Sequence, residues 1–97
     1  MTNYFDEVAS TWENNPIIVE RTQTIAAEIQ RRLPLKKGMT ALELGSGTGL
    51  LSVTLKDHFK EIFLLDSSVE MTNQALLKVN NAGIKHLRPL HFDLEKE

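Results

Sequence analysis

Hydrophobic residues form two kinds of pattern along the chain, short runs and helical repeats. Together these patterns predict six elements. Three short runs rich in apolar residues predict strands over residues 40–44, 61–66 and 87–92. The second is nearly all apolar, which is typical of a strand covered on both faces. Apolar residues three or four positions apart predict helices over residues 16–33, about 49–58 and about 69–79. Pro16 suits the first turn of the first helix, and Pro34 ends it. The predicted order is helix, strand, helix, strand, helix, strand.

This alternation predicts an α/β fold with a parallel sheet and right-handed crossovers. Pro89 lies in the third predicted strand. Because proline has no N–H to donate to a strand ladder, this strand should lie at an edge of the sheet. A spatial strand order of 3-2-1 satisfies both conditions. Before the first helix, residues 1–15 are expected to form an N-terminal arm.

The composition narrows the possible partners. Hydrophobic residues make up 41% of the 97 positions and charged residues 25%, which is typical of a globular protein. The net charge of −2, without a basic cluster, argues against nucleic acid as a partner. No apolar run reaches the roughly 18 residues of a membrane span, so no membrane partner is expected. The absence of cysteine excludes disulfides and thiolate metal sites and fits a cytoplasmic location.

The stretch ALELGSGTGLLS, which begins at position 41, ends the first strand in three alternating glycines. Such a turn allows a ligand to approach the backbone closely. A phosphate-binding loop would need Gly-Lys-Ser/Thr, but Leu50 and Leu51 follow Gly49. Leu50 also fills the position where the dinucleotide fingerprint requires glycine or alanine. In the sequence, no lysine or arginine stands near the turn to meet a pyrophosphate.

Acidic residues stand at the ends of the predicted strands. Asp66 follows Gly47 at about the 20-residue offset expected of an acid that binds ribose hydroxyls. Asp93 follows the third strand. Because the carboxyl ends of parallel strands meet at one edge of the sheet, the turn and both acids should face one crevice. Glu43, just before the turn, would disfavour a polyanion and tolerate a ligand with a cationic part.

Three motifs in this order resemble those of class I S-adenosylmethionine-dependent methyltransferases. ELGSGTG at 43–49 is similar to their first motif, LLDSSVEM at 64–71 to their second, and HFDL at 91–94 to their third. The resemblance covers nearly the whole chain and implies a Rossmann-like, three-layer parallel sheet. The family's seven strands have the order 3-2-1-4-5-7-6, so residues 1–97 would form a single, incomplete domain that holds the cofactor-binding half.

The resemblance also implies a cofactor, S-adenosylmethionine or its product S-adenosylhomocysteine, and a role for each matching residue. The backbone at Gly45 and Gly47 would approach the methionine part of the cofactor, and Glu43 would orient the turn and the cofactor ammonium group. Asp66 would accept hydrogen bonds from the ribose hydroxyls. The adenine would lie near Ser67, Met71, Asp93 and the Leu94 amide. The implied cofactor-binding residues are Glu43, Gly45, Ser46, Gly47, Gly49, Asp66, Ser67, Met71, Asp93 and Leu94.

The implied enzyme moves a methyl group in line from a sulfonium to a nucleophile, so the protein supplies mainly positioning and exclusion of water. The lack of a basic patch favours a small-molecule acceptor, and no catalytic residue is assigned. Two alternatives stay open: a module that binds the cofactor without transferring the methyl group, and, disfavoured by Leu50, a fragment of an NAD-binding dehydrogenase. Whether these 97 residues are active alone also stays open.

Two features of the predicted surface have more than one interpretation. The aromatic residues Tyr4, Phe5 and Trp12 fit either a packed helix face or a lid over the cofactor. The strand at 40–44 would be central in the complete family fold, yet here it has a free edge. A free apolar edge favours pairing with another strand. We therefore expect either self-association along this edge or pairing with the missing C-terminal half.

Overall fold

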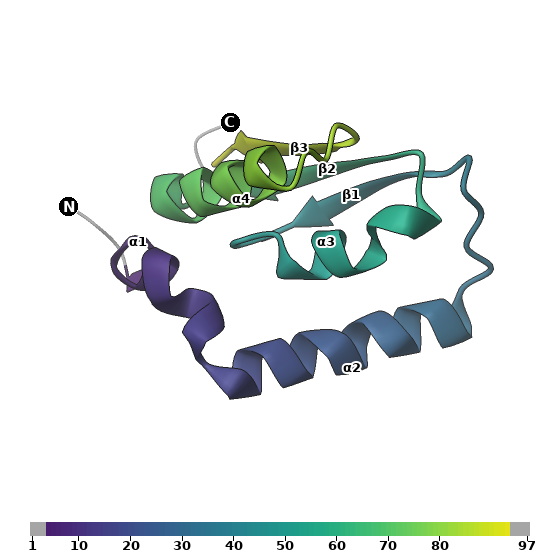
Figure 1. The fold of residues 1–97 in the computed structure, drawn as a ribbon, viewed down its shortest axis with the longest axis horizontal. Helices are drawn as coiled ribbons and strands as arrows, with labels where there is room; N and C mark the ends of the chain where they lie inside the picture. The colour runs from purple at the N-terminus through teal and green to yellow at the C-terminus, as the bar shows by residue number, and fades with distance from the viewer. Residues whose placement is uncertain (1–3, 94–97) are drawn as a thin grey trace.

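The computed structural model describes residues 4–93, which form helices around a small parallel sheet (Figure 1). The α-helices are α1 (Tyr4–Val8), α2 (Pro16–Arg32), α3 (Leu50–Leu55) and α4 (Val69–Asn81). Two short 3-10 helices are η1 (Ala9–Asn14) and η2 (Lys56–His58). The strands are β1 (Thr40–Leu44), β2 (Glu61–Asp66) and β3 (Leu87–His91). No helix within the described range is long and apolar enough to cross a membrane.

The strands form one parallel sheet in the order β1-β2-β3, which confirms the predicted α/β fold and the 3-2-1 order. Pro89 of β3 is paired in register with Leu64 of β2. As expected for a strand that contains proline, β3 lies at an edge. The same sheet leaves the second edge of β1 unpaired among residues 4–93.

The helices α2 and α4 begin where short polar side chains satisfy free backbone amides. The Asn15 side-chain oxygen accepts a hydrogen bond from the Ile17 amide at 2.9 Å, directly before Pro16. The Ser68 hydroxyl accepts one from the Met71 amide at 3.1 Å and starts α4. The helix predicted over about 49–58 divides into α3 and the 3-10 helix η2. Both α3 and α4 start within a few residues of the ends of β1 and β2, which carry the candidate site.

The hydrophobic core lies on one face of the sheet. Ile62 and Leu64 of β2 pack with Val79 of α4 and Leu87 of β3, and all four are at most 4% exposed. Val53 of α3 packs against the same cluster. Because the strands follow one another in space as they do in sequence, right-handed crossovers place α3 and α4 on the same face. Figure 1 shows α2 beyond α3, on the side of α3 away from the sheet.

The other face of the sheet exposes apolar side chains. Leu42 and Leu44 of β1 are 61% and 58% exposed, and Leu90 of β3 is 48% exposed. In the strand register Leu44 lies beside Leu65, which lies beside Leu90. The layers that residues 4–93 supply are therefore the sheet and the helices on one of its faces.

Candidate functional site

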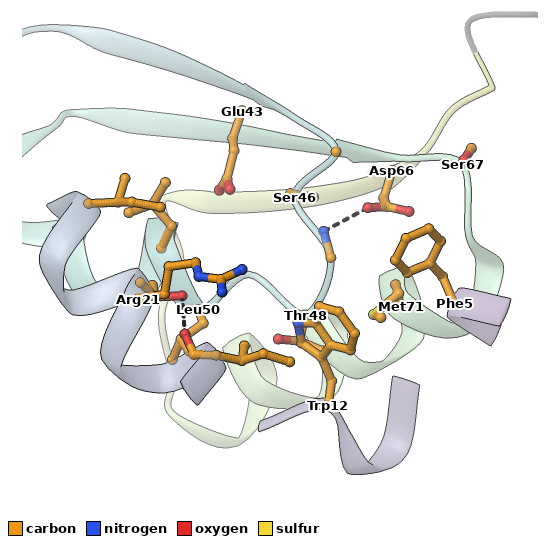
Figure 2. A pocket seen from close by; sticks show the side chains of 16 residues that line it. Phe5, Trp12, Arg21, Glu43, Ser46, Thr48, Leu50, Asp66, Ser67 and Met71 are labelled. Atoms are coloured by element: carbon orange, nitrogen blue, oxygen red, sulfur yellow. Dashed lines mark hydrogen bonds between the residues drawn. The ribbon is translucent and has the colours of Figure 1, made fainter. Parts of the chain in front are cut away.

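The carboxyl ends of β1 and β2 open into a cavity of about 400 Å³, a size typical of small-molecule sites (Figure 2). The structure brings together most of the residues that the sequence assigned to a cofactor. Those that line the cavity are Glu43, Gly45, Ser46, Gly47, Asp66, Ser67 and Met71. Gly49 and Asp93 do not line it. Leu94 lies outside the described residues.

The glycine turn after β1 needs glycine for its backbone conformation. The φ angles of Gly45 and Gly47 are +67° and +58°, in the left-handed region that side chains disfavour. A Cβ built on Gly45 would have no atom within 4 Å, and one built on Gly47 would approach only the Met71 sulfur, at 3.9 Å. The turn therefore presents bare backbone to an open space that a side chain would fill.

Asp66 connects the end of β2 to the glycine turn. Its Oδ2 accepts a hydrogen bond from the Gly47 amide at 2.7 Å, and its Oδ1 accepts one from the Ser68 amide at 2.8 Å. The dashed line in Figure 2 marks the first of these bonds. One carboxylate therefore fixes both the turn and the start of α4 while it faces the cavity.

Glu43 lies in the second half of β1 and contributes a partly buried carboxylate to the cavity. Burial raises the pKa of the Glu43 carboxyl, the hydrogen bond from the Ser52 hydroxyl lowers it, and the charge of Asp66 raises it further, with a net rise. A buried carboxylate near another acid is costly in its ionised form. A cationic group of a ligand placed beside Glu43 would offset that cost.

Gly49 has a different role from the other glycines of the motif. With a φ of +83° it precedes the first residue of α3, and a Cβ built on it would lie 2.9 Å from Leu64 Cδ2 and 3.5 Å from Ala75 Cβ. Gly49 therefore allows α3 to start against β2 and α4, instead of approaching the cavity.

Asp93 follows β3, where the backbone continues to pair with β2 for one more residue. The Phe92 amide donates to the Asp66 carbonyl oxygen at 2.9 Å, and Asp93 itself is partly buried. The third strand end is thus held next to the second, but the Asp93 side chain contributes nothing to the cavity lining.

The N-terminal arm forms part of the cavity wall. Phe5 and Trp12 line the cavity, and their rings meet edge to face with centroids 6.0 Å apart. Tyr4 packs edge to face on Phe5 at 5.4 Å and is 62% exposed. The three aromatic side chains therefore form a cluster, of which two members face the cavity.

Two carboxylates hold the arm in this position. Glu13 of η1 accepts hydrogen bonds from the Thr48 hydroxyl in the glycine turn and from the Lys78 ammonium group of α4. Asp6 of α1 accepts one from the Ser68 hydroxyl. The arm is thus attached to the same turn and the same helix start that Asp66 connects.

The helix α2 supplies a part of the cavity that the sequence analysis did not assign. Ile18, Thr22 and Ile25 line it, together with the guanidinium-bearing Arg21. No cation stands near the glycine turn in sequence, yet the fold brings Arg21 to the same cavity (Figure 2). Arg21 lies three residues after Ile18 and four before Ile25, so helical spacing predicts that the three share one face of α2, but not that this face lines the cavity.

The fold is similar to those of solved methyltransferase structures. A candidate methyltransferase from Haloferax volcanii, solved in complex with the Trm112 methyltransferase activator, is 26% identical with a TM-score of 0.77 over 96% of this chain. A candidate S-adenosyl-L-methionine-dependent methyltransferase from Methanococcus maripaludis is 31% identical with a TM-score of 0.66 over 91%. The DhpI-SAM-HEP complex is 26% identical with a TM-score of 0.72 over 97%.

These relatives are longer than this chain, which spans 40%, 38% and 42% of their respective lengths. No curated protein matches the sequence. A family model matches residues 2–94, and its description is protein-L-isoaspartate(D-aspartate) O-methyltransferase (PCMT). The chain therefore belongs to the protein-L-isoaspartate(D-aspartate) O-methyltransferase family and has the fold of class I S-adenosylmethionine-dependent methyltransferases.

Proposed function

We propose that this chain is the cofactor-binding portion of an S-adenosylmethionine-dependent methyltransferase whose acceptor is a small molecule. The observation that carries the proposal is the pairing of a bare glycine turn with Asp66 at the next strand end, in one cavity. The open space in front of Gly45 and Gly47 fits a ligand that lies against the backbone. A cytoplasmic location belongs to the proposal and rests on composition alone.

The cavity residues at the strand ends have counterparts in S-adenosylmethionine. Asp66 would accept hydrogen bonds from the ribose hydroxyls, and Ser67 and Met71 would lie beside the adenine. The turn at Gly45 and Gly47 would receive the methionine part, with Glu43 near its ammonium group. When bound, the cofactor would supply an activated methyl group. The chain's own residues would position it and, through Phe5 and Trp12, exclude water.

The acceptor is proposed to be a small molecule because the chain carries a net charge of −2 and no basic cluster. The cavity-lining residues assigned above all serve the cofactor, so the residues that would contact the acceptor are not assigned. A module that binds the cofactor without transferring its methyl group uses the same contacts. The two functions differ in turnover and not in cofactor affinity.

S-adenosylhomocysteine is expected to raise the melting temperature of this chain, whereas NAD is not. A ligand present at a hundredfold excess over its Kd stabilises the native state by about 2.7 kcal/mol. Differential scanning fluorimetry with each ligand, followed by isothermal titration calorimetry, measures both effects. If calorimetry shows no heat with S-adenosylhomocysteine while circular dichroism shows a folded chain, the proposed function is wrong. If NAD instead raised the melting temperature, the result would favour the dehydrogenase alternative.

We also propose that the free edge of β1 pairs with a second copy of the chain, because a preparation of these 97 residues contains only copies of this chain. Leu42 and Leu44 are exposed on this strand, and unprotected edges favour intermolecular pairing. Light scattering should therefore show a dimer or larger species at high concentration. Leu42→Lys should give a monomer, because a charge on an edge strand opposes pairing. Leu77→Lys, at a 54% exposed leucine on α4, is the control and should still associate. A monomeric wild-type chain at high concentration contradicts the proposal.

A further inference from the structure

The N-terminal arm, which α1 and η1 form, buries little apolar surface. Among residues 4–14 only Ala9 is buried, and Phe5 is 49% exposed although its ring lines the cavity. A segment that buries few apolar groups gains little stability from packing and opens locally before the core does. The side-chain carboxylates of the arm therefore carry much of what keeps it closed.

Glu13 of η1 joins the arm to two other parts of the molecule. Its Oε2 accepts hydrogen bonds from Thr48 Oγ1 and from Lys78 Nζ. The Glu13 and Lys78 side chains are 31% and 24% exposed, so solvent screens this ion pair less than it screens a surface pair. Thr48 is 4% exposed and stands between Gly47 and Gly49. One oxygen atom of the arm is therefore bonded both to the glycine turn and to a charge on α4.

The side chains that fix the glycine turn come from two parts of the fold with different stability. Asp66 accepts from the Gly47 amide and belongs to β2, which the core holds in place. Glu13 accepts from the hydroxyl of the next residue, Thr48, and belongs to the arm. If the arm moves away, its aromatic rings leave the cavity wall and the turn loses the contact with Glu13.

We propose that Glu13 and Lys78 form a latch that couples the arm to the glycine turn. While the two side chains are paired, the arm is closed and the turn is fixed; when they separate, both are released. Because Glu13 reaches the turn only from the closed arm, closing the arm and ordering the turn are one step. The latch does not depend on which ligand the cavity takes, so it goes beyond the proposed function.

Hydrogen–deuterium exchange of the ligand-free chain, followed by mass spectrometry of peptic peptides, tests the latch. Amide exchange reports the population of locally open states. Glu13→Lys places two positive charges at the pair and should raise the exchange rate of residues 4–14 by about tenfold, the change expected from the loss of one charge-assisted hydrogen bond. Residues 45–49 should also exchange faster, because the amides of Gly47 and Gly49 are hydrogen-bonded while the turn is ordered.

The reverse substitution and the exchanged pair show whether charge is the cause. Lys78→Glu should act like Glu13→Lys, because it leaves two negative charges in contact. The double variant with both substitutions places opposite charges together again and should restore most of the protection. Glu20→Lys is the matched control, since it makes the same charge change at an exposed position of α2 outside the latch. It should leave the exchange of the arm and the turn unchanged.

Peptides from β2, residues 61–66, should exchange alike in every variant, which verifies that each variant is folded. The inference is overturned if Glu13→Lys leaves the exchange of the arm unchanged, or if the arm exchanges faster while the turn does not. It is also overturned if the double variant stays as open as the single variants, or if β2 exchanges faster in step with the arm. Because no ligand enters these measurements, the calorimetric test of the proposed function can fail or succeed independently of them.

Discussion

Asp66→Asn is expected to weaken the binding of S-adenosylhomocysteine by about a hundredfold, since charge-assisted hydrogen bonds contribute about 1.5–3 kcal/mol each. The carboxylate can accept from both hydroxyls of a ribose diol, whereas an asparagine amide has one acceptor oxygen and one donor group. That donor group would also face the amide of Gly47 or Ser68, both of which now donate to Asp66. Isothermal titration calorimetry of the wild-type chain and the variant measures the difference.

The variant can lose affinity for a second reason, because Asp66 also fixes the glycine turn. Adenosine and 2′,3′-dideoxyadenosine separate the two causes. The wild-type chain should prefer adenosine, and Asp66→Asn should remove that preference if the ribose contact is real. Asp57→Asn is the control, since it removes the same charge from a side chain that is 81% exposed. An unchanged preference for adenosine in Asp66→Asn would refute the ribose role and leave Asp66 a purely structural residue.

The two roles of Asp66 are compatible because each carboxylate oxygen can accept more than one hydrogen bond. The bond to Gly47 uses Oδ2 and the bond to Ser68 uses Oδ1, which leaves a lone pair on each oxygen. The amides hold the carboxylate in place before a ligand arrives. Such preorganisation lowers the entropic cost of binding.

Most of the fold could be predicted from the sequence because local rules and long-range packing agree in this chain. The apolar runs predicted the strands to within one residue, and Pro89 alone predicted which strand lies at an edge. Asn15 and Ser68 belong to the residue types that favour helix N-caps, and they cap α2 and α4 in the structure. The division of the helix predicted over about 49–58 into α3 and the 3-10 helix η2 was not predicted. The reason is that η2 continues the same periodicity with tighter hydrogen bonding.

The candidate site could be predicted only where its residues directly follow predicted strands. The glycine turn and Asp66 follow strands directly, so topology alone brings them together. Arg21 and Glu13 reach the same place from segments more than twenty residues earlier. Their positions depend on how α2 and the arm pack against α3 and α4, and no local pattern encodes that packing. The same limit applies to Gly49, whose neighbours Leu64 and Ala75 come from later elements.

Gly49→Ala is expected to destabilise the chain by about 2–5 kcal/mol, from about 1–2 kcal/mol for a left-handed backbone and 1–3 kcal/mol for overpacking. The new Cβ would lie 2.9 Å from a methyl group of Leu64, which is fully buried. Leu64 cannot move aside without disturbing the core around Ile62 and Val79. The loss is a large fraction of the roughly 5–15 kcal/mol that holds a small domain folded. Urea denaturation monitored by circular dichroism measures it as a shift of the midpoint.

Two other glycines in the chain separate the two causes of this loss. Gly83→Ala carries the backbone cost alone, because its φ is +67° and a Cβ there would meet no atom within 4 Å. Gly38→Ala carries neither cost, since its Cβ would also meet no atom and no positive φ is required. The midpoints should therefore fall in the order Gly38→Ala, Gly83→Ala, Gly49→Ala, from highest to lowest. If Gly49→Ala were as stable as Gly83→Ala, the close packing of α3 against β2 would be wrong.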